Sequence, residues 1–282
     1  MFHYRIILPL LVLAASCSKD VKPLLPGPAD AAINFYNASE VMASSQALGT
    51  NNYILTDDTS LHSASFVSYD TDDRQYPNFY PTYGGYGLFS WMRISAGNHR
   101  FWFTCHTQFP VADTSIHIPK DSYQSVYLSE SPEGDAVYRV LVVPEEHAGI
   151  PGKVRIRFVH LSPDAGTLRC YRSMGDGGKT TDGLPQDMAY GTATPYVSLD
   201  TNGTAQTRGN LVLRLVDKND PDNVVLSTGV PAVPGSSFVL LLQGFRQQAT
   251  RRLITGRDAN GKSKDTTVTV TANLRVNVRR TY

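Results

Sequence analysis

The chain has 282 residues, with 26 Lys and Arg against 25 Asp and Glu, and a formal net charge of +1. This balance excludes the strongly basic surface that nucleic-acid binding needs, and a hydrophobic fraction of 41% excludes a chain that is disordered throughout. Many Gly, Pro and Tyr residues favour strands joined by turns over long helices. We therefore expect an all-β protein without a nucleic-acid partner.

The first element is an uncharged apolar run at 6–15. It is too short for a membrane-spanning helix, which needs roughly 20 apolar residues, and it predicts the apolar part of a signal peptide. The run leads into Leu13-Ala14-Ala15-Ser16-Cys17, which resembles the lipobox of bacterial lipoproteins. That resemblance implies a signal peptide at 1–16 and a diacylglycerol on Cys17. Ordinary secretion with an incidental cysteine is the alternative.

The next segment, 17–29, predicts a tether. Ser18-Lys19-Asp20 is similar to the Lys-plus-acid signal with which Bacteroidetes lipoproteins reach the outer face of the outer membrane, although Val21 stands where a second acid is expected. The Pro-rich stretch 22–28 favours an extended, semi-rigid spacer. We expect a lipid-anchored protein of the outer membrane that faces the cell surface, with the periplasmic face as the alternative.

Two similar halves follow the tether. Ile33 aligns with Ile156 and Ser39 with Ser162 at a constant offset. Further matched blocks are 86–87 with 190–191, 92–94 with 197–199, 100–103 with 211–214, and 123–128 with 238–242. Short strand-like blocks separated by turn residues and repeated twice predict two tandem β-sandwiches, at 30–147 and 150–282.

Two segments of the second half indicate how its strands are buried. Val154, Ile156 and Phe158 alternate with arginines, which predicts a strand with one buried face. The run 238–242 is continuously apolar, which predicts a central strand covered on both sides.

The run Val154-Arg155-Ile156-Arg157-Phe158-Val159-His160-Leu161-Ser162-Pro163-Asp164-Ala165 resembles the opening signature of a domain family of unknown function that is common in Bacteroidetes surface lipoproteins. The first half diverges from it, with Asn37 where His160 stands and Glu40 where Pro163 stands. The resemblance implies tandem immunoglobulin-like β-sandwiches and a surface location. It implies no established activity.

No residue set in the sequence specifies catalysis or metal binding. His160, Ser162 and Asp164 are the residue types of a catalytic triad, but they share one strand end and turn, whereas a triad is normally assembled from separated segments. We interpret them as turn chemistry, with His160 pointing inward to hold a loop carbonyl. The acidic runs 70–73 and 217–222 lack the spacing of a calcium loop and are interpreted as turn residues. We expect no catalytic residue, metal or cofactor.

Cys105 and Cys170 remain after Cys17. They either form a disulfide in an oxidising compartment or act as two small buried side chains on separate strands, and the second interpretation is favoured.

The strongest indication of function is the aromatic, Gly- and Pro-rich segment 76–91, where the first half is longer than the second. A lengthened loop on a rigid sandwich is a common place for binding, and exposed rings stack on sugars or anchor protein partners. The candidate ligand-binding residues are Tyr76, Phe79, Tyr80 and Tyr83. Tyr86 and Trp91 are expected in the core. The alternative is that the whole segment plugs one end of the sandwich.

The leading hypothesis is a surface-anchored, non-catalytic binding or structural module, whose ligand is a polysaccharide or an envelope protein. A fimbria-like or matrix component that assembles by strand donation or exchange is the first alternative. The run 266–271, followed by 274–278, is the candidate donated strand, although we expect it to complete its own domain. A glycan hydrolase that uses Asp70 and Asp72 is the minor alternative, because nothing in the spacing sets the separation of two carboxyl groups that glycosidases need.

Overall fold

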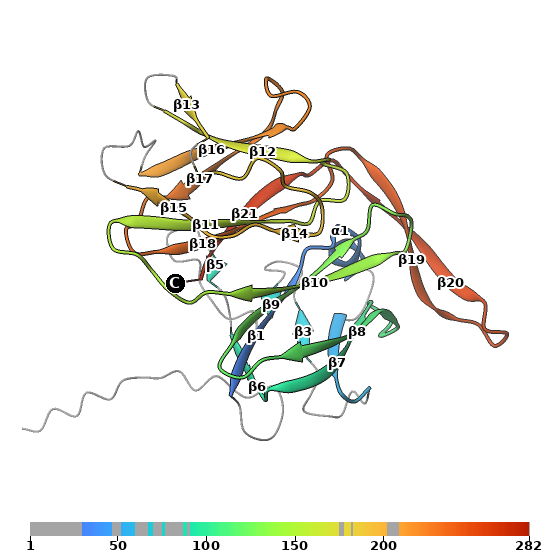
Figure 1. Ribbon diagram of the computed structural model, residues 1–282. Helices are drawn as coiled ribbons and strands as arrows, with labels where there is room; N and C mark the ends of the chain where they lie inside the picture. Colours follow the sequence, from blue (N-terminus) through green and yellow to red (C-terminus); the bar gives the residue numbers. More distant parts are fainter. Residues whose placement is uncertain are drawn as a thin grey trace, which may run out of the picture.

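The computed structural model describes residues 30–46, 52–59, 67–69, 75–76, 87–88, 91–174, 178–181, 183–201 and 209–281 (Figure 1). Its regular elements are nearly all strands, arranged as two β-sandwiches, which confirms the predicted all-β fold class. The short helix α1 (Glu40–Gln46) was not predicted. It begins after Ser39, whose Oγ accepts a hydrogen bond from the Met42 amide at 3.0 Å and so caps the first turn.

The first half is a sandwich of two sheets. In spatial order, its outer sheet contains β3 (Val67–Tyr69), β2 (Asn52–Thr56), β7 (Gly97–Thr104) and β8 (Pro110–Ile118). Its inner sheet contains β10 (Tyr138–Glu145), β9 (Tyr123–Glu130), β1 (Ala31–Asn37) and β4 (Gln75–Tyr76), with β6 (Met92–Ile94) also paired to β1. Phe35 of the inner sheet packs edge-to-face on Phe101 and Phe103 of the outer sheet and marks the centre of the first core.

The second half repeats this arrangement. Its outer sheet contains β13 (Lys179–Thr180), β12 (Leu168–Ser173), β16 (Asn210–Asp217) and β17 (Val224–Pro231). Its inner sheet contains β14 (Thr192–Ala193), β11 (Lys153–His160), β18 (Ser237–Gln243), β21 (Arg275–Arg280) and β5 (Gly87–Leu88), with β15 (Val197–Asp200) also paired to β11. Phe158, Leu213 and Phe238 lie in the second core, between these sheets.

Strand register confirms the internal repeat. Strands β1 and β9 are parallel with Ile33 opposite Gln124, and β11 and β18 are parallel with Ile156 opposite Phe238. Met92 lies opposite Ile33 just as Val197 lies opposite Ile156. The predicted alignments of 33 with 156 and of 92–94 with 197–199 are therefore structural equivalences.

One predicted alignment is wrong. Gln75 lies opposite Tyr36 as Ala193 lies opposite Val159, so β4 and β14 are counterparts, and 86–87 does not match 190–191. Most of the extra length of the first half therefore falls between β4 and β6. Within it, β5 leaves the first half altogether and pairs with β21 of the second.

The inner sheets of the two halves pack face to face, and a third apolar cluster fills the space between them. Its large members are Tyr36, Tyr127, Val143, Val159, Leu161, Val239 and Leu241. Strand β18 is buried along its whole length, so the prediction that it is covered on both sides is confirmed. Strand β11 differs from its prediction of one buried face, because its Arg155 and Arg157 face the first half and are only 8% and 9% exposed.

A hairpin of β19 (Ala249–Arg257) and β20 (Ser263–Val270) lies in sequence between β18 and β21 and projects from the body (Figure 1). It belongs to the second half, but Leu253 and Val268 pack into the first core. Each half thus contributes an inserted segment to the other. Strand β5 of the first half joins the inner sheet of the second half, and the hairpin of the second half packs into the first core. The domain limits 30–147 and 150–282 stay a prediction, and packing crosses them in both directions.

Strand directions define two ends of the body. Strands β1 and β9 begin at one end, which also holds Asp30 and the linker 146–152 between the halves; we call this the Asp30 end. Helix α1 and the base of the β19–β20 hairpin lie at the opposite end, which we call the hairpin end. No helix in the described ranges is long and apolar enough to cross a membrane.

Candidate functional site

Most of the predicted site residues lie outside the described residues. This is true of Cys17, Phe79, Tyr80 and Tyr83, and of the acidic run at 70–73. Tyr76 lies in β4, where its backbone pairs with Phe35. The roles predicted for these residues therefore stay predictions.

The His160 turn behaves as predicted. The His160 ring is buried, its Nε2 lies 2.9 Å from the Gly166 carbonyl oxygen, and burial lowers the pKa of the imidazole. The carboxylate of Asp164 accepts the backbone amides of Arg246 at 2.7 Å and Gln247 at 3.0 Å. The turn therefore fastens the start of β12 to the base of the hairpin.

In the acidic run at 217–222, the contacts of Asp217 are also those of a turn residue. Asp217 Oδ1 accepts the Asn219 amide at 3.0 Å, and its Oδ2 lies 3.4 Å from Arg246 Nη1. Among the described residues, no three His, Cys, Asp or Glu side chains are grouped where they could hold a metal ion.

The two described cysteines are free and buried. Cys105 lies in the first core and Cys170 in the second, which confirms the interpretation as separate buried side chains. Burial raises the pKa of the Cys170 thiol, so this thiol is unreactive in the folded protein.

Sequence reasoning missed a Ser-His-Asp set at the Asp30 end. His99 Nδ1 lies 2.7 Å from Asp57 Oδ2, and Nε2 lies 3.4 Å from Ser95 Oγ. However, Nε2 is closer to the Ser95 carbonyl oxygen, at 2.9 Å, and the Ala96 amide donates to Asp30 at 2.6 Å. The base thus faces a backbone acceptor, and the amide next to the hydroxyl faces a carboxylate instead of a developing oxyanion. The set fastens strand ends and is not arranged for nucleophilic attack.

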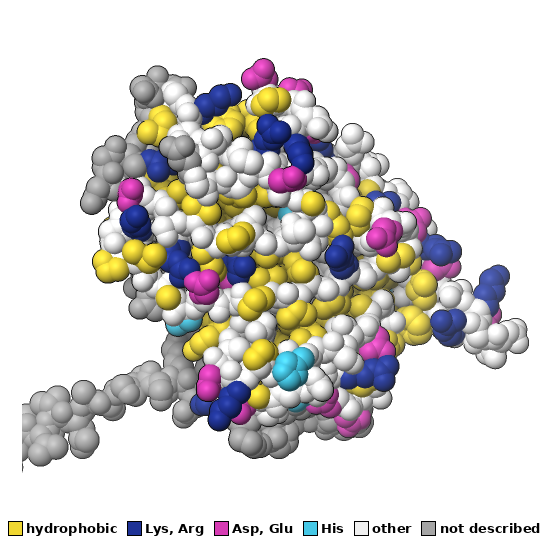
Figure 2. Space-filling view, viewed as in Figure 1, with side chains coloured by type: hydrophobic (Ala, Val, Ile, Leu, Met, Phe, Trp, Pro, Cys, Tyr) yellow, Lys and Arg dark blue, Asp and Glu magenta, His cyan; other side chains and the backbone are white. Residues whose placement is uncertain are grey.

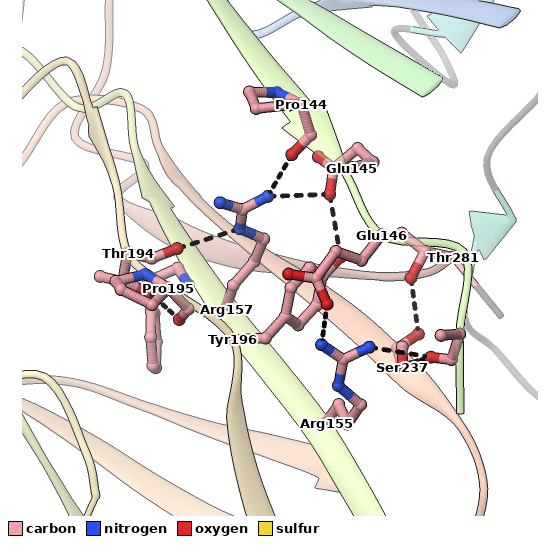
Figure 3. A network of polar contacts seen from close by, with 12 residues as sticks. Pro144, Glu145, Glu146, Arg155, Arg157, Thr194, Pro195, Tyr196, Ser237 and Thr281 are labelled. Carbon is pink, nitrogen blue, oxygen red and sulfur yellow. Dashed lines mark hydrogen bonds and ion pairs between the residues drawn. The ribbon is translucent and has the colours of Figure 1, made fainter. Parts of the chain in front are cut away.

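A polar network in the interface is centred on Arg157 (Figure 3). Its Nη1 donates to Glu145 Oε2 at 3.1 Å and to the Pro144 carbonyl at 2.7 Å, and its Nε donates to the Thr194 carbonyl at 3.0 Å. The Tyr196 hydroxyl donates to the same carboxylate oxygen at 2.9 Å. Residues from both halves therefore share a single charge pair.

Neighbouring groups complete this network. The Tyr127 hydroxyl lies 3.3 Å from Glu145 Oε1, and the Arg155 guanidinium pairs with Glu146 and donates to the Ala148 carbonyl at 3.1 Å. Burial raises the pKa of Glu145, and the Arg157 charge opposes that rise. The polar groups of this network hydrogen-bond or pair with one another across the contact between the two halves. We therefore interpret the network as structural.

A second polar network joins the halves at the hairpin end. Glu40 of α1 accepts from Arg275 Nη2 at 2.7 Å and from Asn273 Nδ2 at 2.8 Å. Nearby, Glu130 Oε1 accepts from Ser39 Oγ at 2.5 Å and from the Val41 amide at 2.7 Å, and burial raises the pKa of Glu130.

The candidate functional site is the surface at the Asp30 end. Trp91 meets Tyr123 edge-to-face with ring centroids 5.1 Å apart, and His147 stacks on Tyr123 at the same separation. Tyr123 is 36% exposed, and the apolar side chains of Ile150 and Val233 are 37% and 45% exposed. Trp91 is half-buried and outside the first core, so its predicted core position is wrong.

Figure 2 shows the surface context of this site. On the face that is drawn, yellow apolar side chains reach the surface at the left edge and across the middle, with dark blue and magenta charged side chains between them, and charged side chains also lie on the hairpin at the right. We call this surface the Asp30-end patch. It consists of Trp91, Tyr123, His147, Ile150 and Val233.

Comparison with known proteins adds one local match. Residues 82–171 match a family described as a domain of unknown function, DUF4397. The match runs from the end of the first half's insertion into β12, and so covers parts of both halves. Among curated proteins, none matches the chain.

Among solved structures, the Bacillus anthracis TIE protein aligns with 88% of this chain and 43% of its own length, at 8% identity and a TM-score of 0.23. The chain thus spans less than half of that protein. A likeness this weak supports no conclusion about function.

Proposed function

We propose that this protein is a cell-envelope lipoprotein that acts as a non-catalytic binding or structural module. In this proposal, the lipid on Cys17 holds it in the outer membrane and the body faces the cell surface. One observation carries the non-catalytic part. The structure describes buried side chains of types that often act in catalysis, such as Arg157, Glu145 and His160. These side chains bind other parts of the fold and join strands or the two halves.

The ligand that we propose is a glycan, with an envelope protein as the second possibility. The first half carries most of its extra length between β4 and β6, and the sequence there is rich in Tyr, Phe, Gly and Pro. A body held by two buried polar networks is a rigid support for such a segment. Tyr76, Phe79, Tyr80 and Tyr83 are the residues proposed to contact the ligand.

Native gels cast with a panel of polysaccharides test the glycan proposal. We expect one polysaccharide to retard the protein and the double variant Tyr80→Ala/Tyr83→Ala to lose that retardation. Tyr171→Ala is the matched control, since it removes a tyrosine from the outer sheet of the second half. Absence of retardation across the panel would contradict a glycan ligand and direct the search to envelope proteins by pull-down.

Lipidation and location are tested separately. Metabolic labelling with a radioactive fatty acid should label the protein, and Cys17→Ser should abolish the label. Digestion of intact cells by an added protease should then remove the body. A labelled protein that resists digestion until the outer membrane is opened would place it on the periplasmic face instead.

A further inference from the structure

We propose that the Asp30-end patch docks on the lipid surface, with Trp91 and Tyr123 at the level of the headgroups and Ile150 and Val233 beside them. The inference rests on the proposed lipid anchor and extends it. The body is then not a freely swinging particle on a tether but lies with one defined end on the membrane.

The patch draws its residues from both halves and from the linker between them. Tyr123 stacks on His147 of the linker, and Ile150 follows three residues later. The linker is fastened to the second half, because the Ala148 carbonyl accepts from Ser237 Oγ at 2.6 Å. The turn that carries Val233 is held beside it, since the Gly235 amide donates to the Lys153 carbonyl at 2.8 Å. The exposed apolar side chains therefore share one end of the body.

The chemistry of the patch suits an interfacial layer. Tyr and Trp are amphipathic and concentrate where a bilayer meets water. Some charged groups near the patch have partners: Glu146 pairs with Arg155, Lys153 Nζ lies 3.6 Å from Asp200, and the Asp30 carboxylate accepts the Ala96 amide. Lys120 and Asp121, next to Tyr123, are exposed, so this end presents charged as well as apolar side chains.

The path of the chain indicates what covers the patch. The proposed tether, residues 17–29, joins the body at Asp30, and the lipid is proposed 13 residues upstream, on Cys17. A tether turns weak contacts into effective ones, because it holds the patch at a high local concentration near the bilayer. The hairpin lies at the other end, which leaves it pointing away from the membrane.

The chain offers two tryptophans for the test. Trp91 lies in the patch, whereas Trp102 lies on β7, with the Arg100 guanidinium 4.8 Å from its ring. In Trp102→Phe, Trp91 is the remaining tryptophan, and in Trp91→Phe, Trp102 is. Both lipidated proteins are placed in phosphatidylcholine–phosphatidylglycerol vesicles with brominated acyl chains, which quench tryptophan at short range. Flotation of the vesicles measures anchoring independently.

We expect quenching of Trp91 to be several times that of Trp102 and strongest for bromines near the headgroup. Ile150→Glu, an exposed substitution that leaves both cores intact, should reduce the quenching of Trp91 while the protein still floats. Flotation with equal, weak quenching of both tryptophans would overturn the docking and leave the anchor standing. Failure to float would overturn the anchor, and the docking with it.

Discussion

Arg157 of the second half reaches across the stacked inner sheets to Glu145 of the first, with 3.1 Å between Nη1 and Oε2 and side-chain exposures of 10% and 1%. A charge pair at this depth stabilises only when its remaining hydrogen-bond capacity is filled, and here Tyr196 and the carbonyls of Pro144 and Thr194 fill it. The pair therefore sets how the two sandwiches face each other.

Removal of one partner should be costly. In Arg157→Met, Glu145 stays buried without its cation, and we expect the free energy of unfolding to fall by about 3–5 kcal/mol. The double variant Glu145→Gln/Arg157→Met removes the stranded charge and should recover much of that loss. Equilibrium unfolding in urea measures both. If Arg157→Met is as stable as the wild type, the pair does not join the halves.

Glu130 should make stability depend on pH. Burial raises its pKa above the ordinary value of 4.5, with Ser39 and Val41 opposing the rise and Glu40 adding to it. A raised folded-state pKa gives stability that is fully present below 4.5 and is lost as pH rises through the folded-state value. Relative to Glu130→Gln, the wild type should therefore gain stability as pH falls from neutrality toward 4.5. Parallel pH profiles of the two proteins would contradict this assignment.

His160 should make stability depend on pH in the opposite direction to Glu130. Burial lowers its pKa from 6.5, so its contribution is present above 6.5 and is lost as pH falls through the folded-state value. Gln at this position keeps a donor for the Gly166 carbonyl but does not titrate. We expect the wild type to lose stability relative to His160→Gln as pH falls below 6.5. Chemical denaturation across this pH range measures the difference, and a constant difference would show that folding leaves the pKa of His160 unchanged, which would contradict this prediction.

Sequence reasoning succeeded where local pattern and burial coincide. The apolar run 238–242 predicted a strand covered on both sides, and the His160 turn was predicted from turn chemistry alone. It failed at Arg155 and Arg157, because alternation shows which residues differ along a strand but not what covers the polar face. Here a second sheet covers it and supplies Glu145 as a partner.

The segments that each half contributes to the other could not be predicted from the sequence, for a related reason. Leu253 and Val268 have the pattern of an ordinary hairpin, and nothing local indicates that they pack into the first core. The Asp30-end patch arises in the same way, because Trp91, Tyr123 and His147 are brought together by three separate segments.

The central claim is that the two halves pack into one body that unfolds as a single unit. Its most direct test uses the two buried thiols. Cys105 reports on the first core and Cys170 on the second, and mass spectrometry after alkylation at increasing urea follows each. We predict one shared midpoint, and a shift of both thiols to lower urea in Leu253→Ala, which should cost about 2–5 kcal/mol. Separate midpoints, or a shift of Cys105 alone, would show two independent sandwiches and contradict the account.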